Sequence, residues 1–456
     1  MPDVVEPRIV PRQEHPISRR DIDPDALKVL YRLRQGEYVA YLVGGSVRDL
    51  LLGRHPKDFD IGTSAHPYQV KKLFRNCWII GRRFRLAHVK FGQKVIEVAT
   101  FRRQVAVGEE VVQDGVPAPD PSTPEGEQLV HHDNTFGTPE EDAFRRDFTI
   151  NALAYDIATF SIIDFVGGLD DLRAGIVRSI GDPDVRITED PVRMIRAIAI
   201  AARLDFAIEP SLLRSIRTHR HEILRSSLPR LLEEYYKILR QGSAEKAFRQ
   251  LAEVGLLEPI STELHHGASD PLWRSLAAVD EYRRQFESTP DTLSNAILLG
   301  SLLIPLAISL HPPRPGHGHD PDDDGGDGPR SRRPRFPPGP RLGDLPLARR
   351  DVERLRQIIS LQRRLRDLTA SERAQRSLAH RGIFREALTW MEIHGDAPDV
   401  VEHWMGIIDE GGAPEPGSED SGDEGEPQQP DAAHAVPHKK RRRRRRRGRR
   451  GGGHAS

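Results

Sequence analysis

The pattern of hydrophobic and polar positions divides the chain into a mixed first part and a helical second part. Over residues 25–35, apolar residues recur at helical spacing, which predicts a helix with Asp23 or Asp25 as its N-cap. The next segments predict, in chain order, a buried strand at 39–43, a short helix at 46–52, a strand at 59–61 and a hairpin of 88–91 with 94–99. Strands and helices mixed in this order indicate an α/β or α+β head of about 160 residues.

From Glu189 onward the pattern is helical. Apolar residues recur at helical spacing in the segments 192–204, 212–224, 231–239, 244–254, 348–368 and 382–394. Residues 311–345 are rich in Pro, Gly, Asp and Arg, a composition typical of a disordered insertion. After residue 411 we expect no packed structure.

Opposite charges are separated along the chain although they cancel in total. The 68 basic and 68 acidic residues among 456 give a formal net charge of zero. Residues 415–426 are acidic, whereas residues 439–450 are almost entirely basic. The neutral total therefore does not argue against a nucleic-acid partner.

The sequence predicts a cytoplasmic protein that does not enter a membrane. Its one cysteine, Cys77, excludes an intrachain disulfide, which fits a reducing compartment. The first residues are rich in charge and proline and lack the apolar core of a secretory signal. The longest apolar run, around 296–310, is interrupted by Pro305 and is too short to span a bilayer.

Candidate chemistry begins where the first strand meets its helix. Gly44 and Gly45 allow backbone N–H groups to approach phosphate oxygens at a helix N-terminus, although a double glycine also makes ordinary turns. Asp58 and Asp60 would project from one face of a strand, and two adjacent carboxylates repel unless they share a cation. The sequence therefore predicts that Asp58 and Asp60 ligate a metal.

Glu97 supplies a third carboxylate in an otherwise apolar strand. Three carboxylates fit a site for two Mg²⁺ ions, in which one ion activates an attacking hydroxyl and the other holds a triphosphate. We therefore expect Asp58, Asp60 and Glu97 to be catalytic.

Residues 42–63 resemble the first motif of the class II nucleotidyltransferases, a branch of the DNA polymerase β superfamily that contains tRNA CCA-adding enzymes and bacterial poly(A) polymerases. The resemblance runs from about His15 to Leu257 and continues more weakly to Ile408. It implies a polymerase-β-like α+β head of mixed sheet and helices, then an all-α neck and body, then a disordered basic tail. The implied boundaries are an N-terminal extension at 1–24, the head at 25–165, the neck at 166–260, the body at 261–410 with the insertion at 311–345, and the tail at 411–456.

Two later segments resemble motifs that contact the nucleotide in this family. Residues 145–153 resemble the second motif, and Glu189–Arg193 resembles the motif whose Asp and Arg hydrogen-bond the incoming base. The nucleotide-binding residues that the resemblance implies are Gly44, Gly45, Arg48, Arg146, Asp147, Asp190, Arg193 and Arg196. The chain departs from the family at Ala199 and Ile200, where relatives commonly carry an arginine and an aromatic residue.

From the residues alone, the same charged positions also fit ordinary helix chemistry. Asp190 and Arg193 fit a helix start with an ion pair three residues apart. Arg230 and Glu234, in a segment that resembles a further family motif, fit a solvated pair four residues apart.

The choice of substrate depends on smaller features. Residues 79–88 resemble the signature that separates bacterial poly(A) polymerases from CCA-adding enzymes, and Arg82, Arg83 and Arg85 in it are expected to contact RNA phosphates. The opening segment from His15 also resembles the polymerases. The arginine-rich tail, with Arg441, Arg442 and Arg443, is expected to bind RNA without sequence preference.

The resemblance thus implies an enzyme that uses ATP to add adenylate to RNA 3′ ends, with the RNA-decay machinery as an expected partner. CCA addition to tRNA is the alternative activity. A non-catalytic RNA-binding protein on the same scaffold is the alternative of another class.

The basic tail generates a prediction about salt dependence. Each RNA phosphate that it neutralises contributes about 0.7 to the slope of log affinity against log salt concentration. Deletion from Lys439 onward should flatten this slope and weaken binding to all RNAs alike. The measurement is RNA affinity at several salt concentrations for the full-length and shortened chains. Equal slopes would mean that the tail does not touch RNA.

Overall fold

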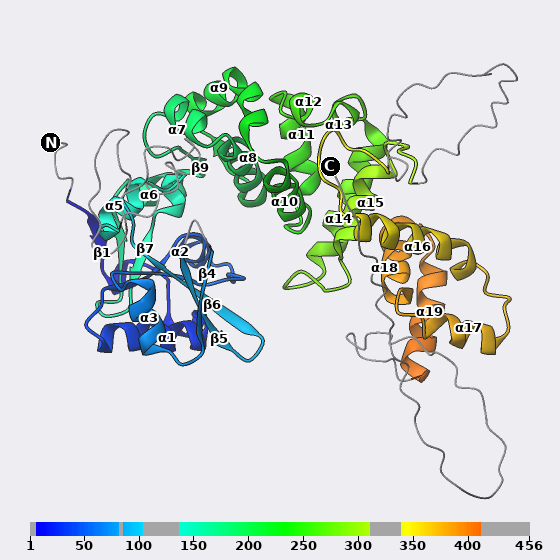
Figure 1. Ribbon diagram of the computed structural model, residues 1–456, viewed down its shortest axis with the longest axis horizontal. Helices are drawn as coiled ribbons and strands as arrows, with labels where there is room; N and C mark the ends of the chain where they lie inside the picture. Colours follow the sequence, from blue (N-terminus) through cyan, green and yellow to red (C-terminus); the bar gives the residue numbers. More distant parts are fainter. Residues whose placement is uncertain (1–5, 82–84, 104–135, 311–338, 412–456) are drawn as a thin grey trace, which may run out of the picture. The chain divides into compact units, whose positions relative to one another are not determined.

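A mixed eight-stranded sheet dominates the first part of the chain (Figure 1). The computed structural model describes residues 6–81, 85–103, 136–310 and 339–411. The sheet has the strand order β1-β8-β7-β2-β3-β6-β5-β4. All neighbouring strands are antiparallel except β3 and β6, which are parallel. The strands are β1 (Arg8–Val10), β2 (Ala40–Val43), β3 (Asp60–Thr63), β4 (Cys77–Ile80), β5 (Leu86–Phe91), β6 (Lys94–Thr100), β7 (Ala154–Asp156) and β8 (Ser161–Asp164).

The two faces of this sheet have different surroundings. Leu42, Ile61 and Tyr155 are buried in the main core together with residues of α1 (Pro24–Gln35) and α3 (Pro67–Leu73). Figure 1 shows both helices against the same side of the strands. The next residues along these strands, Val43 and Ala154, belong to a small separate cluster on the opposite face. Side chains at the ends of the central strands that project from this opposite face are therefore not covered by the main core.

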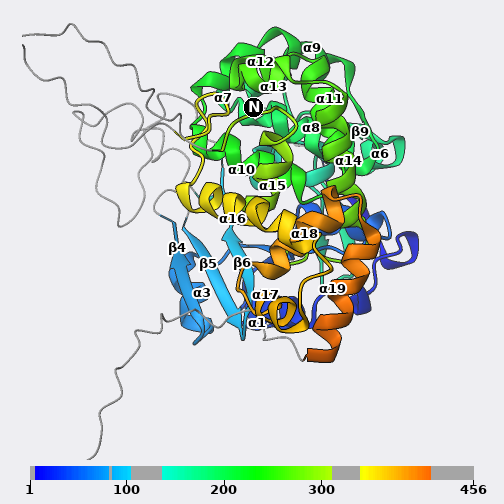
Figure 2. The ribbon, with the colours of Figure 1, turned by 90° about the vertical axis from the view of Figure 1, so that its right-hand side faces the viewer.

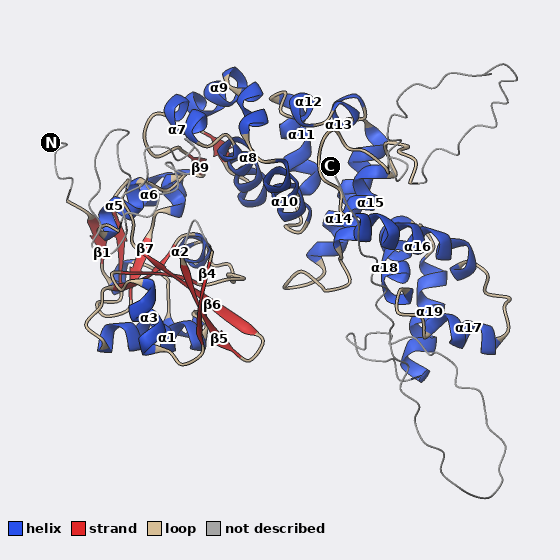
Figure 3. Cartoon of the chain, in the orientation of Figure 1, coloured by secondary structure: helices blue, strands red, loops and turns tan. Residues whose placement is uncertain are grey.

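The rest of the described chain is almost entirely helical, as the colours of Figure 3 show. Short helices α2 (Gly45–Leu51), α5 (Pro139–Phe144) and α6 (Gly168–Ala174) accompany the sheet, and β9 (Ile176–Val177) pairs in parallel with β10 (Ala207–Ile208). The later helices are α7 (Pro183–Glu189), α8 (Val192–Leu204), α9 (Pro210–Thr218), α10 (Leu228–Leu239), α11 (Ala244–Glu253), α12 (Leu257–Ile260), α13 (Thr262–His266), α14 (Asp270–Arg284), α15 (Asn295–Leu303), α16 (Arg349–Leu365), α17 (Glu372–Ala379), α18 (Phe384–His394) and α19 (Pro398–Gly411). None of the helices in the described ranges is long and apolar enough to cross a membrane.

The α+β class and the helical second part that the sequence predicts are confirmed. Helix α1 begins as expected, because the Asp23 carboxylate accepts hydrogen bonds from the backbone N–H groups of Asp25 and Ala26. The predicted hairpin is formed by β5 and β6, with His88 opposite Glu97. The predicted basic tail lies outside the described residues.

Two segments differ from the sequence-based expectation. The predicted N-terminal extension contributes β1, whose residues 8–10 pair with β8 at the edge of the sheet. The predicted disordered insertion extends too far, because Leu342 and Leu345 at its end are buried and the Gly343 N–H donates to Glu263 at 2.8 Å. Composition alone does not show that a few apolar residues in a proline- and glycine-rich segment have a core to join.

The packing of this segment can be tested by truncating Leu342, whose side chain is fully buried. Leu342→Ala should lower the free energy of unfolding by about 2–5 kcal/mol, the usual cost of a buried leucine that is replaced by alanine. Chemical denaturation measures the change, and Arg341→Ala at the exposed neighbouring position is the control. Equal loss, or no loss, in both variants would contradict the buried placement.

Candidate active site

A tight turn joins β2 to α2 and brings Arg146 over the backbone. Gly44 has a φ of +78°, and a Cβ atom at this position would lie 3.1 Å from Nη1 of Arg146. A side chain here would therefore be strained by the backbone conformation and would also crowd the guanidinium group. Gly45 begins α2 and is half-buried. The predicted glycine turn is present and lies directly beside one predicted nucleotide-binding arginine.

Asp60 and Glu97 lie side by side next to this turn. Asp60 is the first residue of β3 and pairs with Val43, the last residue of β2. The parallel register that pairs Ile61 with Val98 places Asp60 beside Glu97, one position earlier on each strand. Both carboxylates are on the exposed face of the sheet.

Asp58 lies near Asp60, but not on the strand that the sequence predicts for both residues. Strand β3 begins at Asp60, so Asp58 lies in the segment before the strand, and the expected pair on one strand is wrong in its secondary structure. Asp58 is nevertheless exposed and close enough to act on Asp60 electrostatically. Phe59 between them packs against the core, as expected from alternation.

The electrostatics of Asp60 are those of a crowded acidic site. Desolvation by the surrounding protein, together with repulsion from Glu97 and Asp58, raises the pKa of Asp60 to about 6, while Arg146 opposes this rise. No group of three or more His, Cys, Asp or Glu side chains in the described ranges is arranged as a ready metal cage. The donor set still fits Mg²⁺, which is often held by one or two carboxylates and completes its shell with water and substrate phosphate oxygens.

Arg48 is buried rather than open to a ligand. Its Nε and Nη2 donate to Asp49 at 2.9 and 2.8 Å, and its Nη1 donates to the Asn151 side chain. Arg203 of α8 pairs with the same Asp49 carboxylate at 2.9 Å. Burial lowers the pKa of Arg48, and the charge of Asp49 opposes that change. The structure therefore gives Arg48 a positioning role between α2 and Asn151 of the second motif, and its direct contact with a nucleotide stays a prediction.

The second motif forms a chain of charge-paired residues. Arg146 donates to Asp142 through Nε and Nη2, at 3.2 and 3.0 Å, and its Nη1 donates to the Asn151 carbonyl. Asp147 is buried and lies 2.6 Å from Nη2 of Arg196 on α8. Burial alone would raise the pKa of Asp147, but Arg196 and the hydrogen bonds that Asp147 accepts hold it below its ordinary value. Asp147 thereby holds Arg196 in position.

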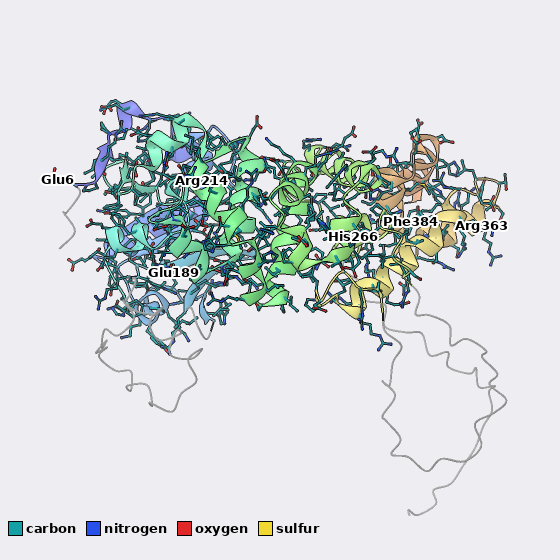
Figure 4. All side chains as sticks on the ribbon, turned by 90° about the horizontal axis from the view of Figure 1, so that it is seen from above. Glu6, Glu189, Arg214, His266, Arg363 and Phe384 are labelled. Carbon is teal, nitrogen blue, oxygen red and sulfur yellow. The ribbon has the colours of Figure 1, made fainter. Side chains whose placement is uncertain are left out.

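The predicted base-selecting residues have partners other than those expected. Asp190 follows α7 and forms a bidentate pair with Arg230 of α10, at 2.8 and 2.7 Å. Arg193 donates to Glu189 at 3.2 Å and to the Arg186 carbonyl. Figure 4 labels Glu189 at the end of α7.

The two ion pairs that residue spacing predicts, Asp190 with Arg193 and Arg230 with Glu234, are replaced by pairs with other partners. Asp190 pairs with Arg230 rather than with Arg193, and the largely buried Glu234 pairs with Lys237 at 2.9 Å rather than with Arg230. The reason is the approach of α10 to α8, which offers Arg230 a planar two-point contact with a carboxylate.

The remaining predicted residues are placed as follows. Arg85 is exposed immediately before β5, whereas Arg82, Arg83 and the tail arginines lie outside the described residues. Ala199 is buried and Ile200 packs against the core, so neither can supply the phosphate contact of an arginine.

Sequence reasoning missed several residues that support the site. Asn151 links Arg48, Arg146 and Asp147 through its side chain and its carbonyl. Arg186 is buried and donates to the carbonyls of Arg145 and Arg146, at 2.6 and 2.8 Å. Asn151 lies within the second motif, which was the available signal, but no local pattern marks Arg186.

A sheet that presents carboxylates beside a glycine turn, followed by helices that carry arginines to it, resembles the head of the nucleotidyltransferases. Residues 40–178 match the poly(A) polymerase head domain, residues 205–267 the probable RNA and SrmB-binding site of polymerase A, and residues 341–449 the polymerase A arginine-rich C-terminus. The chain is thus similar to polymerase A in three separate segments, and its relatives include both poly(A) polymerases and CCA-adding enzymes.

Known relatives of both kinds are similar over half of their length. Poly(A) polymerase I of Salmonella typhi is 50% identical over 255 residues, which are 55% of this chain and 53% of that protein. The Haemophilus influenzae poly(A) polymerase I is 41% identical over 253 residues, 55% of this chain and 54% of that protein. The CCA-adding enzyme of Lactobacillus helveticus is 37% identical over 241 residues, 53% of this chain and 56% of that protein. The chain thus spans about half the length of the curated relatives it matches.

A solved structure agrees with the fold over a longer range. The Bacillus stearothermophilus CCA-adding enzyme in complex with CTP superposes with a TM-score of 0.52 at 24% identity, over 85% of this chain and 83% of that chain. This likeness confirms the α+β head followed by helices.

The buried Asp142 generates a prediction about pH. Its pKa is held below the ordinary value because the pairing with Arg146 and Arg145 outweighs desolvation. A carboxylate with a lowered folded-state pKa contributes stability above its unfolded-state pKa of about 4, and this contribution is lost as the pH falls through the folded-state value.

Asp142→Asn should therefore lower the free energy of unfolding by about 1.5–3 kcal/mol at neutral pH. The difference from the unchanged protein should shrink below about pH 4. Denaturation over a pH series measures it, with Asn in place of the exposed Asp291 as the control. A difference that is constant with pH would contradict the charge pairing.

Proposed function

We propose that this protein is a template-independent polynucleotide adenylyltransferase that adds adenylate from ATP to RNA 3′ ends. The observation that carries the proposal is the meeting of Asp58, Asp60 and Glu97 beside the Gly44 turn. The 50% identity with a poly(A) polymerase I across this region supports the same reaction.

The carboxylates would hold two Mg²⁺ ions, with Asp58 and Asp60 as the direct ligands. Bound there, the metal supplies charge neutralisation for the triphosphate and activation of the RNA 3′-hydroxyl. The negative charges of Asp58 and Glu97 keep the site favourable to cations, and their repulsion of Asp60 is relieved when a cation binds. Arg146, fixed by Asp142, presents its guanidinium group over the turn that would receive the phosphates.

Asp190 and Arg193 would select the base. Arg230 holds the Asp190 carboxylate through both of its oxygens. Arg193 is held by its hydrogen bonds to Glu189 and to the Arg186 carbonyl. Polar groups held in this way reject a wrong base, because their own hydrogen bonds would then remain unmade.

RNA would bind along the exposed basic residues and the tail. The match of residues 205–267 to an RNA-binding segment supports a further RNA contact in the helical part. A cytoplasmic location and a partner in the RNA-decay machinery remain proposals.

CCA addition to tRNA is the second candidate, and the 37% identity with a CCA-adding enzyme supports it. One experiment separates the candidates. The protein is offered a generic RNA or a tRNA that lacks its CCA end, with Mg²⁺ and with ATP and CTP singly and together. Long adenylate tails on both RNAs with ATP alone support the proposal. Incorporation limited to the tRNA and requiring CTP would replace it, and no pyrophosphate release would leave the RNA-binding alternative.

Loss of either predicted metal ligand should abolish transfer. Asp58→Ala and Asp60→Ala should each lower kcat about a thousandfold or more, since several kcal/mol of transition-state stabilisation are lost. RNA affinity and unfolding should change little, because both side chains are exposed. Single-turnover rates at matched Mg²⁺ measure the effect, with Asp291→Ala as the control. Near-normal turnover would refute the metal assignment.

Removal of the Arg193 side chain should relax the choice of nucleotide. Arg193→Ala should lower the preference for ATP over CTP about tenfold to a hundredfold, the discrimination expected of a lost polar contact to the base. The ratio of kcat/KM for the two nucleotides measures the effect, and Arg214→Ala on the exposed side of α9 is the control. An unchanged ratio would place base selection elsewhere.

A further inference from the structure

The strand register extends the carboxylate site into a row across the sheet. Trp78 of β4 lies opposite His88 of β5, and His88 lies opposite Glu97 of β6, which is beside Asp60 of β3. Residues directly opposite each other in neighbouring strands project from the same face. Trp78 therefore ends a row that begins at the predicted metal ligands. Figure 2 shows β4, β5 and β6 as adjacent strands.

Trp78 is unusual among the tryptophans of this chain. It is 53% exposed, whereas Trp273, Trp390 and Trp404 are 8%, 6% and 0% exposed. Ile80, on the same face of the same strand, is 50% exposed. Large apolar side chains together on one open face of a sheet usually mark a binding surface.

The exposure is confined to one face of these strands. On the other face, Cys77, Val89 and Val98 are buried in the main core, which also includes Val70 of α3. The strands are thus fully packed on one side, and their second side is an open platform.

Polar groups of suitable charge accompany the aromatic ring. Lys90 is exposed on the same face as His88, two residues further along β5. Arg85 is exposed immediately before β5. Neither cation has a carboxylate partner among the described residues.

We propose that Trp78 stacks against a base near the 3′ end of the RNA strand and so guides that end to the carboxylates. The inference rests on the proposed function and assigns the RNA-positioning surface of the same site. Three strand spacings separate Trp78 from Asp60, about 14 Å, a distance that a base near the end of a bound strand can bridge.

Single-stranded RNA is the occupant that fits this platform. Exposed aromatic rings bind unpaired bases by stacking, which tolerates every base, while neighbouring cations contact the backbone. The platform is also continuous with the site that the 3′-hydroxyl must reach.

The first test uses the fluorescence of Trp78, because the other three of the four tryptophans are buried. In the free full-length protein, acrylamide should quench Trp78 readily. An oligoadenylate with a 3′-hydroxyl, added without ATP, should quench its emission and protect it from acrylamide, and Trp78→Phe should remove this signal. A Trp78 that is already shielded in the free protein, or that does not respond to bound RNA, would overturn the proposal.

The second test separates RNA positioning from chemistry. Trp78→Ala should raise the KM for RNA about tenfold, the cost of one lost stacking contact, with little change in kcat or in the KM for ATP. Trp78→Phe keeps an aromatic ring and should therefore have a KM for RNA close to that of the unchanged protein. Tyr68→Ala is the matched control, since Tyr68 is 59% exposed on α3 and lies away from the platform. An unchanged KM for RNA in Trp78→Ala would overturn the proposal.

The failure of the platform and the failure of the proposed function can be told apart. RNA-dependent protection of Trp78 requires no nucleotide transfer, so a protein that protects Trp78 but adds no adenylate keeps the platform and loses the proposed function. Adenylate addition without protection keeps the function and loses the platform.

Discussion

The parallel register between β3 and β6 decides where negative charge collects in this protein. This register pairs Ile61 with Val98 and so places Asp60, at the start of β3, beside Glu97. The other neighbour of β3 is β2, which leads directly into the Gly44 turn. Desolvation, together with repulsion from Glu97 and Asp58, raises the pKa of Asp60 to about 6. Carboxylates held this close together favour a bound cation, because the cation relieves their mutual repulsion. A cation in this place would in turn attract the phosphates of a nucleotide.

Arginine–carboxylate contacts carry this site into the helical part of the chain. Arg186 of α7 binds backbone carbonyls of the second motif, and Arg196 and Arg203 of α8 bind Asp147 and Asp49. These contacts are directional, so they fix how α8 faces the site in a way that apolar packing alone would not. The arginines of α8 are therefore divided between support and the proposed reading of the base.

Local patterns predicted the elements that depend on near neighbours in the chain. Helix α1 and helix α8 have an apolar face at the helical period, and the hairpin of β5 and β6 has alternating residues, so both kinds of element were predicted from the sequence. The pairing of residues 8–10 with β8 joins segments about 150 residues apart, and no local pattern specifies such a partner. The same holds for the packed segment at 339–345, where a few leucines find a core that composition does not reveal.

The sequence by itself determined which residues are candidates for the chemistry, because carboxylates, glycines and arginines in ordered motifs retain their character in any fold. Tertiary structure decided their partners. Asp190 could pair with Arg193 by spacing, yet it binds Arg230 from a helix forty residues away. Arg48 could face a ligand, yet it is buried against Asp49. Trp78 could have joined a core, yet it ends an open row of the sheet. In each case the outcome depends on which surfaces packing brings together, and that depends on the whole chain rather than on the neighbours of one residue.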